Sequence, residues 1–478
     1  MELNFLNLID FYKAGHKFQY PKGTNLVFSN FTPRKSRISG MQSIVFFGLQ
    51  YFIKEYLTSP NIDVSQYARR INNSLGKDSI TFEHVVALRK YVQVHNHLPI
   101  TIWALPEGSR VPMGVPPLVM WNTEPEFFWL TNYLETILSA TLWQACTSAT
   151  IAANYRNLFE EWAKHTGGDL SFVQFQGHDF SFRGMSSLES AILSGMGHLL
   201  SFSGTDTVPA IDALEEFYEA DSDKELVGVS VPATEHSVMS MGGKESELET
   251  YERLLELYPT GIVSIVSDTW DFWKVLTEIL PKLKDKILAR NGKVVIRPDS
   301  SKKTPLEIIC GDPYSSDPNE CKGAIQLLWE TFGGTINEKG YKVLDPHIGL
   351  IYGDSITVKL ANDICADLAL QGFASTNWVA GIGSYTYQYN TRDTFGFAMK
   401  ATYGEVNGEP REIFKDPVTD NGTKKSAKGL ISVFKDGKDN YVMRDQATWT
   451  DVVNCCYKEV YPITQDQTLG EIRARIRL

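Results

Sequence analysis

The chain has 478 residues, 43% hydrophobic and 12% aromatic, so it is long enough for two or three domains with a large core. Its net charge of −11 argues against non-specific nucleic-acid binding, because a phosphate-binding surface is normally basic, but it leaves room for a small basic pocket. Six cysteines without a CxxC pair, and no signal peptide or long apolar run, predict a soluble intracellular protein without disulfides or a zinc site.

Residues 1–165 form the first predicted region, which mixes strands and helices. A strand is expected at 26–31, helices at 41–56 and 125–163, and β-like sequence interrupted by prolines at 98–120. No strand–helix period repeats here, so the region predicts an α+β part.

Residues 166–400 alternate apolar runs with helical patterns. Strands are expected at 170–175, 226–231, 261–266, 293–296, 348–352 and 377–379, and helices at 186–201, 245–258, 271–288, 322–332 and 355–370. Alternation at about 30 residues predicts βα units, and six or more units favour a barrel of parallel strands over an open sheet. The Asp-, Pro- and Cys-rich stretch 311–321 is expected to be a surface insertion.

Residues 401–478 return to alternating, turn-rich sequence, for example at 430–437. We expect this part to pack with residues 1–165, because chain termini often lie close together. The predicted fold class is therefore α/β, with an irregular (β/α) barrel and a second α+β domain formed from both chain ends.

Two loops around the predicted helix at 186–201 carry an unusual set of side chains. Residues 176–187 include Phe180 and Arg183, and residues 204–207 include Asp206. Arg183 precedes the helix, whose Ser186 and Glu189 have capping-box spacing, and free N–H groups at a helix N-terminus favour an anion. The loops predict a site for a flat, polar and anionic ligand; the alternative is an ordinary turn with Arg183 paired to a core carboxylate.

Polar residues also follow four predicted strands, at the ends where barrel enzymes place their active sites. They are Glu235 and His236; Ser267, Asp268 and Asp271; Arg297, Asp299 and Ser300; and Gly353 and Asp354. A single residue of this kind is most often a structural group satisfied by hydrogen bonds. The set favours a common site, because buried charges are costly unless they are compensated.

Glycines and basic residues add a candidate phosphate site. Gly383 and Ser384 lie in a loop where backbone N–H groups can approach an anion, although one GxG is weak evidence. Positive charge is supplied by Arg34, Lys35, Arg37, Arg392, Lys400 and Lys415, whereas Lys424, Lys425 and Lys428 are interpreted as solvated surface. The sequence has no Walker A motif, so a nucleotide would not be bound by a P-loop.

The motifs taken together resemble those of the nicotinamide phosphoribosyltransferase family, within the nicotinate and nicotinamide branch of the type II phosphoribosyltransferases. They occur in the same order at residues 10–13, 178–184, 204–207, 235–237, 266–268, 296–300, 353–354, 391–393 and 414–418. The resemblance implies a type II phosphoribosyltransferase fold and a cytoplasmic homodimer with its active site at the subunit interface. It also implies transfer of the phosphoribosyl group from phosphoribosyl pyrophosphate to nicotinamide in NAD salvage. Mg²⁺ would be bound through substrate phosphates, and ATP would be a co-substrate. Neither nucleic acid nor a membrane is an expected partner.

By this resemblance the pyridine ring is held by Phe180, Asp206, Arg297, Ser267, Tyr12 and Asp10. Phe180 of one subunit and Tyr12 of the other would stack on the ring. Asp206 would accept from the carboxamide NH₂ while Arg297 or Ser267 donates to its carbonyl. A nicotinate carboxylate would meet Asp206 with like charge, so Asp206 distinguishes this reading from the alternative, a nicotinate phosphoribosyltransferase.

The resemblance also assigns the ribose and phosphates. Asp299 and Asp354, with Gly353, would hold the ribose; Gly383 and Ser384 the 5′-phosphate; and Arg183, Arg34, Arg392, Lys400 and Lys415 the remaining phosphates. His236, flanked by Glu235 and oriented by Asp271, would carry a phosphoryl group from ATP. The alternative is that His236 only hydrogen-bonds substrate phosphates.

Three details depart from the family pattern: Phe11 replaces a usual Ser, Ser301 with Lys302 and Lys303 replaces a common glycine, and Tyr385 interrupts a glycine run. The last two affect the phosphate loops, because a Cβ can prevent close backbone approach. A catalytically inactive binding relative is a further alternative. It should have lost some of the residues Phe180, Arg183, Asp206, His236, Arg297, Asp299 and Arg392, and the sequence keeps them all.

Overall fold

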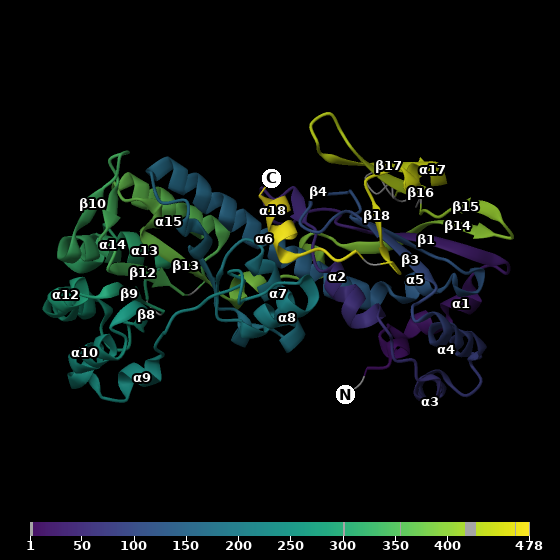
Figure 1. Cartoon of the computed structure of the whole chain (residues 1–478), viewed down its shortest axis with the longest axis horizontal. Coiled ribbons are helices and arrows are strands. Elements are labelled where there is room, and N and C mark those ends of the chain that lie inside the picture. The colour runs from purple at the N-terminus through teal and green to yellow at the C-terminus, as the bar shows by residue number, and fades with distance from the viewer. Residues whose placement is uncertain (1–2, 300–301, 354, 416–426, 464, 478) are drawn as a thin grey trace. The chain divides into compact units, whose positions relative to one another are not determined.

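The computed structural model describes residues 3–299, 302–353, 355–415, 427–463 and 465–477, and the chain divides into two compact units (Figure 1). The first unit comprises residues 1–150, 213–220 and 390–478, and the second comprises 151–212 and 221–389. The chain therefore passes from one unit to the other at 150/151, within helix α6 (Glu135–Thr166), at 212/213, at 220/221 and at 389/390. The sequence instead predicts boundaries at 165/166 and 400/401.

The first unit is built on a six-stranded antiparallel sheet in the order β15-β14-β1-β5-β3-β18. Its strands are β1 (Thr24–Thr32), β3 (Ile100–Ala104), β5 (Leu118–Asn122), β14 (Ala398–Val406), β15 (Glu409–Glu412) and β18 (Lys458–Tyr461). Strand β1 pairs with β14 on one side and β5 on the other, so strands from both chain ends share one sheet. Phe28 and Phe31 of β1 are fully buried in its core.

Shorter elements complete this unit. Strand β2 (Ser43–Val45) pairs with β4 (Arg110–Pro112), and β16 (Leu430–Lys435) pairs with β17 (Tyr441–Ala447). Its helices are α1 (His16–Gln19), α2 (Leu49–Phe52), α3 (Val64–Leu75), α4 (Glu83–His95), α5 (Leu130–Tyr133), α17 (Trp449–Val453) and α18 (Leu469–Ile476). The helix predicted at 41–56 is wrong in its first part, where β2 pairs its backbone with β4.

The second unit is built on a parallel sheet in the order β7-β6-β13-β12-β9-β8. Its strands are β6 (Gly177–Asp179), β7 (Gly204–Thr205), β8 (Thr260–Val266), β9 (Asn291–Arg297), β12 (Ile348–Tyr352) and β13 (Trp378–Ile382). The segment 229–234 connects the two edges, because Val229 pairs with Gly204 and Ala233 pairs with Ser264. The sheet is therefore curled into an irregular barrel, which confirms the predicted α/β fold class. All five residues of β12 are buried, as expected for a strand covered on both faces.

Helices surround this sheet, and Figure 1 shows α12 to α15 around β8, β9 and β12. They are α7 (Leu188–Leu199), α8 (Val208–Tyr218, shared with the first unit), α9 (His236–Ser240), α10 (Glu247–Leu257), α11 (Phe272–Lys274), α12 (Leu280–Leu288), α13 (Pro305–Cys310), α14 (Pro318–Phe332), α15 (Val358–Leu370) and α16 (Ser384–Tyr387). A hairpin of β10 (Gly334–Ile336) and β11 (Lys342–Leu344) follows α14. Among the described residues no helix is long and apolar enough to cross a membrane.

Three local predictions for the second unit are wrong. Residues 172–175 form a 3₁₀ helix rather than a strand, and β6 begins only at Gly177. The run 226–231 contributes one isolated bridge, at Val229. Short apolar runs do not distinguish a strand from a buried turn, which explains both errors. The N-cap of α7 is Ser187, whose hydroxyl accepts from the Ser190 N–H, rather than Ser186.

Candidate active site in the barrel

The carboxyl ends of the parallel strands carry most of the predicted site residues. Phe180 follows β6, Asp206 follows β7, Asp268 follows β8, Arg297 and Asp299 lie at the end of β9, Gly353 follows β12, and Gly383 and Ser384 follow β13. Parallel strands end at the same edge of a sheet, so these residues share one face of the barrel. Asp354, Ser300 and Ser301 lie outside the described residues.

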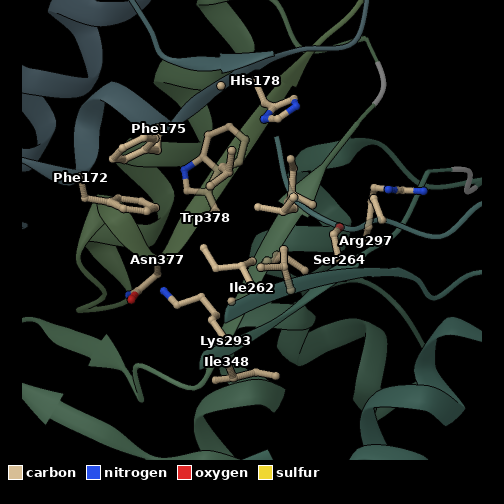
Figure 2. Close-up of a pocket in the computed structure, with 18 of the residues that line it drawn as sticks. Phe172, Phe175, His178, Ile262, Ser264, Lys293, Arg297, Ile348, Asn377 and Trp378 are labelled. Atoms are coloured by element: carbon tan, nitrogen blue, oxygen red, sulfur yellow. The ribbon is translucent and has the colours of Figure 1, made fainter. Parts of the chain in front are cut away.

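A cavity of about 480 Å³ lies inside the barrel (Figure 2). Its walls are mostly apolar and aromatic, as in ligand-binding pockets generally. Polar side chains on its lining are His178, Asp206, Ser230, Ser264, Lys293, Arg297, Thr376 and Asn377. In Figure 2, His178 and Arg297 lie toward one side of the cavity, and Lys293 and Asn377 toward the other. The cavity therefore offers a flat ligand an apolar environment with a few polar groups.

Two glycines make room for the Phe180 ring on this cavity. A Cβ placed on Gly381 would lie 2.7 Å from Cδ2 of Phe180 and 2.6 Å from Cα of Gly353. A Cβ on Gly353 would lie 3.0 Å from Oδ1 of Asp299. Gly381 therefore requires a residue without a side chain, and Gly353 lies between the aromatic ring and the Asp299 carboxylate, which are close together.

Asp206 is held by side chains from two neighbouring segments. His178 Nε2 lies 3.0 Å from Asp206 Oδ1, and the Ser230 hydroxyl donates to the same oxygen at 2.5 Å. Burial raises the pKa of Asp206, but the hydrogen bonds from His178 and Ser230 and the positive charge of Arg297 outweigh it, so the pKa lies below its ordinary value. Asp206 is therefore an ionised acceptor on the cavity wall.

The two loops that carry Phe180 and Asp206 are joined beneath the site by Asp179, which is fully buried. Its carboxylate accepts from the Ser181 N–H at 2.9 Å and from the Thr207 hydroxyl at 2.7 Å. A buried carboxylate is stable only when hydrogen bonds replace its hydration, so this contact fixes both loops.

A chain of polar contacts runs along the ends of β8 and β9. His236 Nε2 lies 3.0 Å from Asp268 Oδ1, and Asp268 Oδ2 accepts from the Asp299 N–H at 2.9 Å. Arg297 Nε lies 3.3 Å from Asp299 Oδ1, and Arg297 also donates to the Thr234 carbonyl. Burial raises the pKa of Asp299, opposed by Arg297 and reinforced by the negative charge of Asp268. These polar and charged groups thus form one row of hydrogen bonds and ion pairs.

The predicted partner of His236 is wrong. Asp271 is the N-cap of α11, and its carboxylate caps that helix by accepting from the Lys274 N–H at 3.1 Å. Asp268 takes its place beside the imidazole. Glu235 precedes α9 and accepts from the Ser237 hydroxyl.

The predicted contact of Ser267 with the ligand is also wrong. Ser267 is fully buried; it donates to the Ile265 carbonyl at 2.7 Å and accepts from the Tyr251 hydroxyl at 2.8 Å. Alternate residues of a strand face opposite sides, so Ser264 of β8 lines the cavity and Ser267 does not.

The loops after β6 and β13 meet around Gly184. A Cβ on Gly184 would lie 2.0 Å from the Ser384 hydroxyl oxygen, so the backbone next to Arg183 touches Ser384. Gly383 faces open space, with no atom within 4 Å of a Cβ placed there. Tyr385 is 54% exposed and stacks on Tyr389 at 5.4 Å, so its ring does not fill that space. The two predicted phosphate-binding loops are therefore adjacent.

The other predicted phosphate-binding residues lie in the first unit, around a pocket of about 900 Å³. Arg34, Lys35, Arg37, Lys400 and Lys415 line it together with Asp393. Burial lowers the pKa of Lys400, and the charges of Arg34 and Lys415 lower it further. Positive charges held this close together favour binding of a polyanion. Lys428 instead pairs with Glu412 at 2.9 Å, and Lys424 and Lys425 lie outside the described residues.

Arg392, Tyr12 and Asp10 also belong to the first unit. The Arg392 guanidinium lies 3.5 Å from the Asp393 carboxylate at the pocket wall. Tyr12 is 61% exposed, and its ring meets His16 edge-on at 4.9 Å. Asp10 accepts from the Thr136 hydroxyl at 2.8 Å. The exposed ring of Tyr12 is available for a further contact.

The sequence reasoning missed His178, Ser230 and Ser264 as lining residues. His178 lies within the motif at residues 178–184, which by itself assigns it no role, and serines are too common to stand out. Strand alternation could have predicted Ser264 as a lining residue, since it lies on the same side of the paired strands β8 and β9 as Arg297. Among the described residues, no group of three or more His, Cys, Asp or Glu side chains is arranged to hold a metal.

Comparison with known proteins identifies relatives along the whole chain. The nicotinate phosphoribosyltransferase (NAPRTase) family matches residues 175–460, and the nicotinamide phosphoribosyltransferase N-terminal domain matches residues 4–102. The chain is 56% identical to a nicotinamide phosphoribosyltransferase of Acinetobacter baylyi, over 99% of this chain and 97% of that protein. It is 35% identical to one from Mycoplasma pneumoniae, over 89% of this chain and 95% of that protein.

Solved structures share the fold. Nicotinate-nucleotide pyrophosphorylase from Pyrococcus furiosus has a TM-score of 0.57 at 13% identity, with 99% of this chain and 95% of that chain covered. Human nicotinic acid phosphoribosyltransferase has a TM-score of 0.54 at 14% identity, with 98% and 92% covered. Similarity at these identities concerns the fold alone.

Proposed function

The chain belongs to the nicotinate phosphoribosyltransferase (NAPRTase) family, and from this premise we propose that it transfers the phosphoribosyl group from phosphoribosyl pyrophosphate to nicotinamide. The products are nicotinamide mononucleotide and pyrophosphate, in NAD salvage. Family membership confirms the resemblance carried by the motifs. The observation that supports nicotinamide as the substrate is the ionised Asp206 carboxylate on the same cavity wall as the Phe180 ring.

Asp206 and Phe180 suit an uncharged pyridine amide. Stacking on an aromatic ring contributes roughly 0.5–1.5 kcal/mol beyond area burial. The carboxamide NH₂ donates to Asp206, and Ser264 or Arg297 is placed on the cavity lining to donate to its carbonyl. A pyridine carboxylate would instead face Asp206 with like charge. The site therefore favours the amide.

The reaction forms a bond between the pyridine nitrogen and the anomeric carbon of the ribose. The bond from that carbon to pyrophosphate breaks, and pyrophosphate leaves with the electron pair. Positive charge develops on the ribose, so Asp299, near the Phe180 ring, is suited to hold its hydroxyls and stabilise that charge. No proton transfer is needed, because the pyridine nitrogen becomes a cation in the product.

The basic pocket around Arg34, Lys400 and Lys415 is suited to the phosphates, with Arg392 beside it. Arg183 and the adjacent loop of Gly383 and Ser384 are suited to the 5′-phosphate. Bound Mg²⁺ would neutralise the leaving group through substrate oxygens, and the basic pocket fits a metal that arrives on those phosphates.

His236 is the proposed carrier of a phosphoryl group from ATP. Its contact with Asp268 holds the imidazole in one tautomer, so that the other ring nitrogen is free to attack the γ-phosphate. That attack forms a P–N bond and releases ADP. We also propose a homodimer, in which Tyr12 of one subunit and Phe180 of the other stack on the pyridine. We place the enzyme in the cytoplasm, because all six cysteines are free thiols.

A product assay tests the proposed reaction. The purified protein is incubated with phosphoribosyl pyrophosphate, Mg²⁺ and ATP, with either nicotinamide or nicotinate, and the mononucleotides are separated by chromatography. Nicotinamide is expected to react faster, and omission of Mg²⁺ to stop the reaction. Faster turnover of nicotinate would assign the alternative substrate, and no product from either would indicate an inactive binding relative.

A labelling experiment tests the role of ATP. Wild type and His236→Ala are incubated with γ-labelled ATP and precipitated under alkaline conditions that preserve phosphohistidine. We expect label on the wild type alone. Equal label on both proteins would exclude His236 as the acceptor and support a simple hydrogen-bonding role.

A further inference from the structure

Both hydrogen bonds to the Asp206 carboxylate reach the same oxygen. His178 Nε2 at 3.0 Å and the Ser230 hydroxyl at 2.5 Å both contact Oδ1. In the part of the chain that the structure describes, no donor lies within hydrogen-bond distance of Oδ2. An ionised carboxylate only accepts hydrogen bonds, so His178 carries its proton on Nε2. One oxygen is thus saturated by protein, and the other is left for a ligand.

The backbone around His178 fixes the orientation of its ring. His178 lies in β6, with Gly204 of β7 on one side and Gly381 of β13 on the other. A Cβ placed on Gly204 would lie 2.7 Å from His178 Nδ1, so the ring rests directly on the β7 backbone. On the cavity side, the ring lies 4.6 Å from the Phe180 ring. The imidazole is therefore confined on two sides while Nε2 points at Asp206.

Without His178, Asp206 would keep a single side-chain donor. The Ser230 hydroxyl can rotate with the carboxylate, so it does not by itself fix which oxygen faces the cavity. Loss of a donor would also allow the pKa of Asp206 to rise, since burial opposes ionisation of this group. A protonated Asp206 could donate to a pyridine carboxylate. Selection of an amide thus depends on how Asp206 is held as well as on its presence.

We propose that His178 is the positioning residue that sets the amide selectivity of this site, because it holds Oδ1 of Asp206 and presents Oδ2 to the carboxamide NH₂. The inference rests on the proposed function and adds a residue to it. His178 need not touch the reacting atoms. Its removal should weaken recognition of the pyridine and leave the bond-forming step nearly unchanged.

Two substitutions at His178 separate the hydrogen bond from the bulk of the ring. His178→Gln keeps an N–H donor at similar reach, whereas His178→Leu keeps bulk and removes the donor. For each variant, kcat and KM are measured with nicotinamide and with nicotinate at saturating phosphoribosyl pyrophosphate. Folding is checked by thermal unfolding. His347→Gln, which changes a histidine that pairs with Asp345 and does not line the cavity, is the matched control.

For His178→Leu we expect the nicotinamide KM to rise about tenfold, as for loss of one hydrogen bond to a charged group. The ratio of kcat/KM for nicotinamide to that for nicotinate should fall by a similar factor, with kcat changed much less. His178→Gln should have a selectivity ratio close to that of the wild type, and the control variant His347→Gln should have the wild-type ratio. Gly204→Ala, whose Cβ would displace the ring from Nδ1, should reproduce the loss of selectivity and serves if the Leu variant does not fold.

An unchanged selectivity ratio in both His178→Leu and Gly204→Ala, with the wild type preferring nicotinamide, would overturn the inference alone. The inference would also be overturned if His178→Gln is folded but no more selective for nicotinamide than His178→Leu, because the hydrogen-bond donor would then be irrelevant. A wild type that makes no mononucleotide from nicotinamide would refute the proposed function, and the inference with it.

Discussion

The hydrogen bond between His236 and Asp268 decides which of two nearby carboxylates orients the imidazole. Both aspartates follow β8, and sequence spacing alone does not rank them. In the fold, Asp271 caps α11 and is committed to the Lys274 N–H, so Asp268 faces the ring. The fold also decides between Ser264 and Ser267, because alternate residues along a strand face opposite sides. The Ser264 hydroxyl faces the cavity, and the Ser267 hydroxyl faces the core.

Asp268→Asn should therefore lower ATP-dependent labelling of His236 by roughly tenfold or more, the effect of removing a carboxylate partner from a functional imidazole. Asp271→Asn is the control, because Asn caps a helix about as well as Asp and α11 should remain intact. Labelling with γ-labelled ATP measures both. If Asp271→Asn lost the label and Asp268→Asn kept it in full, Asp271 rather than Asp268 would be the carboxylate partner of His236.

Gly381→Ala tests the space reserved for Phe180. The new Cβ would lie 2.7 Å from Cδ2 of the ring, so the ring must move and stacking should weaken. We expect the KM for nicotinamide to rise roughly two- to tenfold, matching the energy of one aromatic contact. The KM for phosphoribosyl pyrophosphate should rise less, through a shift of Gly353, whose Cα would lie 2.6 Å from the new Cβ. Gly437→Ala, at an open position in the first unit, is the control. Equal changes in both KM values would indicate a general distortion.

At the scale of elements, the barrel gathers loops that are distant in sequence. β6 and β13 are parallel neighbours although about 200 residues separate them, and the segment 229–234 connects the two sheet edges. Within this frame Asp179 connects the loops after β6 and β7 through Ser181 and Thr207. The positions of Phe180 and Asp206 thus depend on a buried carboxylate that has no direct role in the proposed chemistry.

Asp179→Asn should destabilise the second unit and loosen both loops. The amide keeps one acceptor oxygen instead of two and carries no charge, so the buried Thr207 hydroxyl loses its carboxylate acceptor, and the free energy of unfolding should fall by roughly 1–3 kcal/mol. The nicotinamide KM should rise as well. Urea unfolding and steady-state kinetics give the two readouts, and Asp169→Asn, at an exposed position, is the control. Unchanged values in both experiments would remove Asp179 from this structural role.

At the scale of the whole molecule, the two units carry different parts of the proposed chemistry. The barrel of the second unit has a mostly apolar cavity with an ionised acceptor, which suits an uncharged pyridine. The first unit has a basic pocket, which suits phosphates, and the exposed Tyr12 ring. An acidic chain thus concentrates positive charge where the leaving group would bind.

The proposed homodimer predicts complementation between two inactive variants. Phe180→Ala and Tyr12→Ala should each lower activity, because each removes one stacking face. When the two proteins are unfolded together and refolded, heterodimers contain one site with both wild-type rings. We expect activity to be partly restored in the mixture but not in either variant refolded alone. No restoration in verified heterodimers would place both rings in the same subunit.

Two buried histidines should make stability depend on pH. Burial lowers the pKa of His84, in the first unit, and of His198, in the second, to about 4. An unfolded histidine has a pKa near 6.5, so between about pH 6.5 and 4 the unfolded chain binds more protons. Stability is therefore complete above this window and is lost as pH falls through it. From pH 7 to 5 each histidine should account for about 2 kcal/mol.

Unfolding by urea at pH 7 and 5 measures this loss. His84 packs edge-on against Phe18 and Trp129, so His84→Phe keeps an aromatic contact and removes the titration. The variant should lose about 2 kcal/mol less than the wild type over that interval. An identical loss in both proteins would show that His84 does not titrate as described.

The sequence by itself determined the fold class, the order of the motifs and most of the residues at the strand ends. It could do so because βα periodicity is local, and because catalytic residues must occur at the carboxyl ends of parallel strands. Only the tertiary structure decided which partner each side chain has: Asp268 rather than Asp271 for His236, Ser264 rather than Ser267 on the cavity, and His178 with Ser230 on one oxygen of Asp206. A hydrogen bond depends on distances of a few tenths of an ångström between segments far apart in the chain, and such distances are fixed only when the barrel is closed.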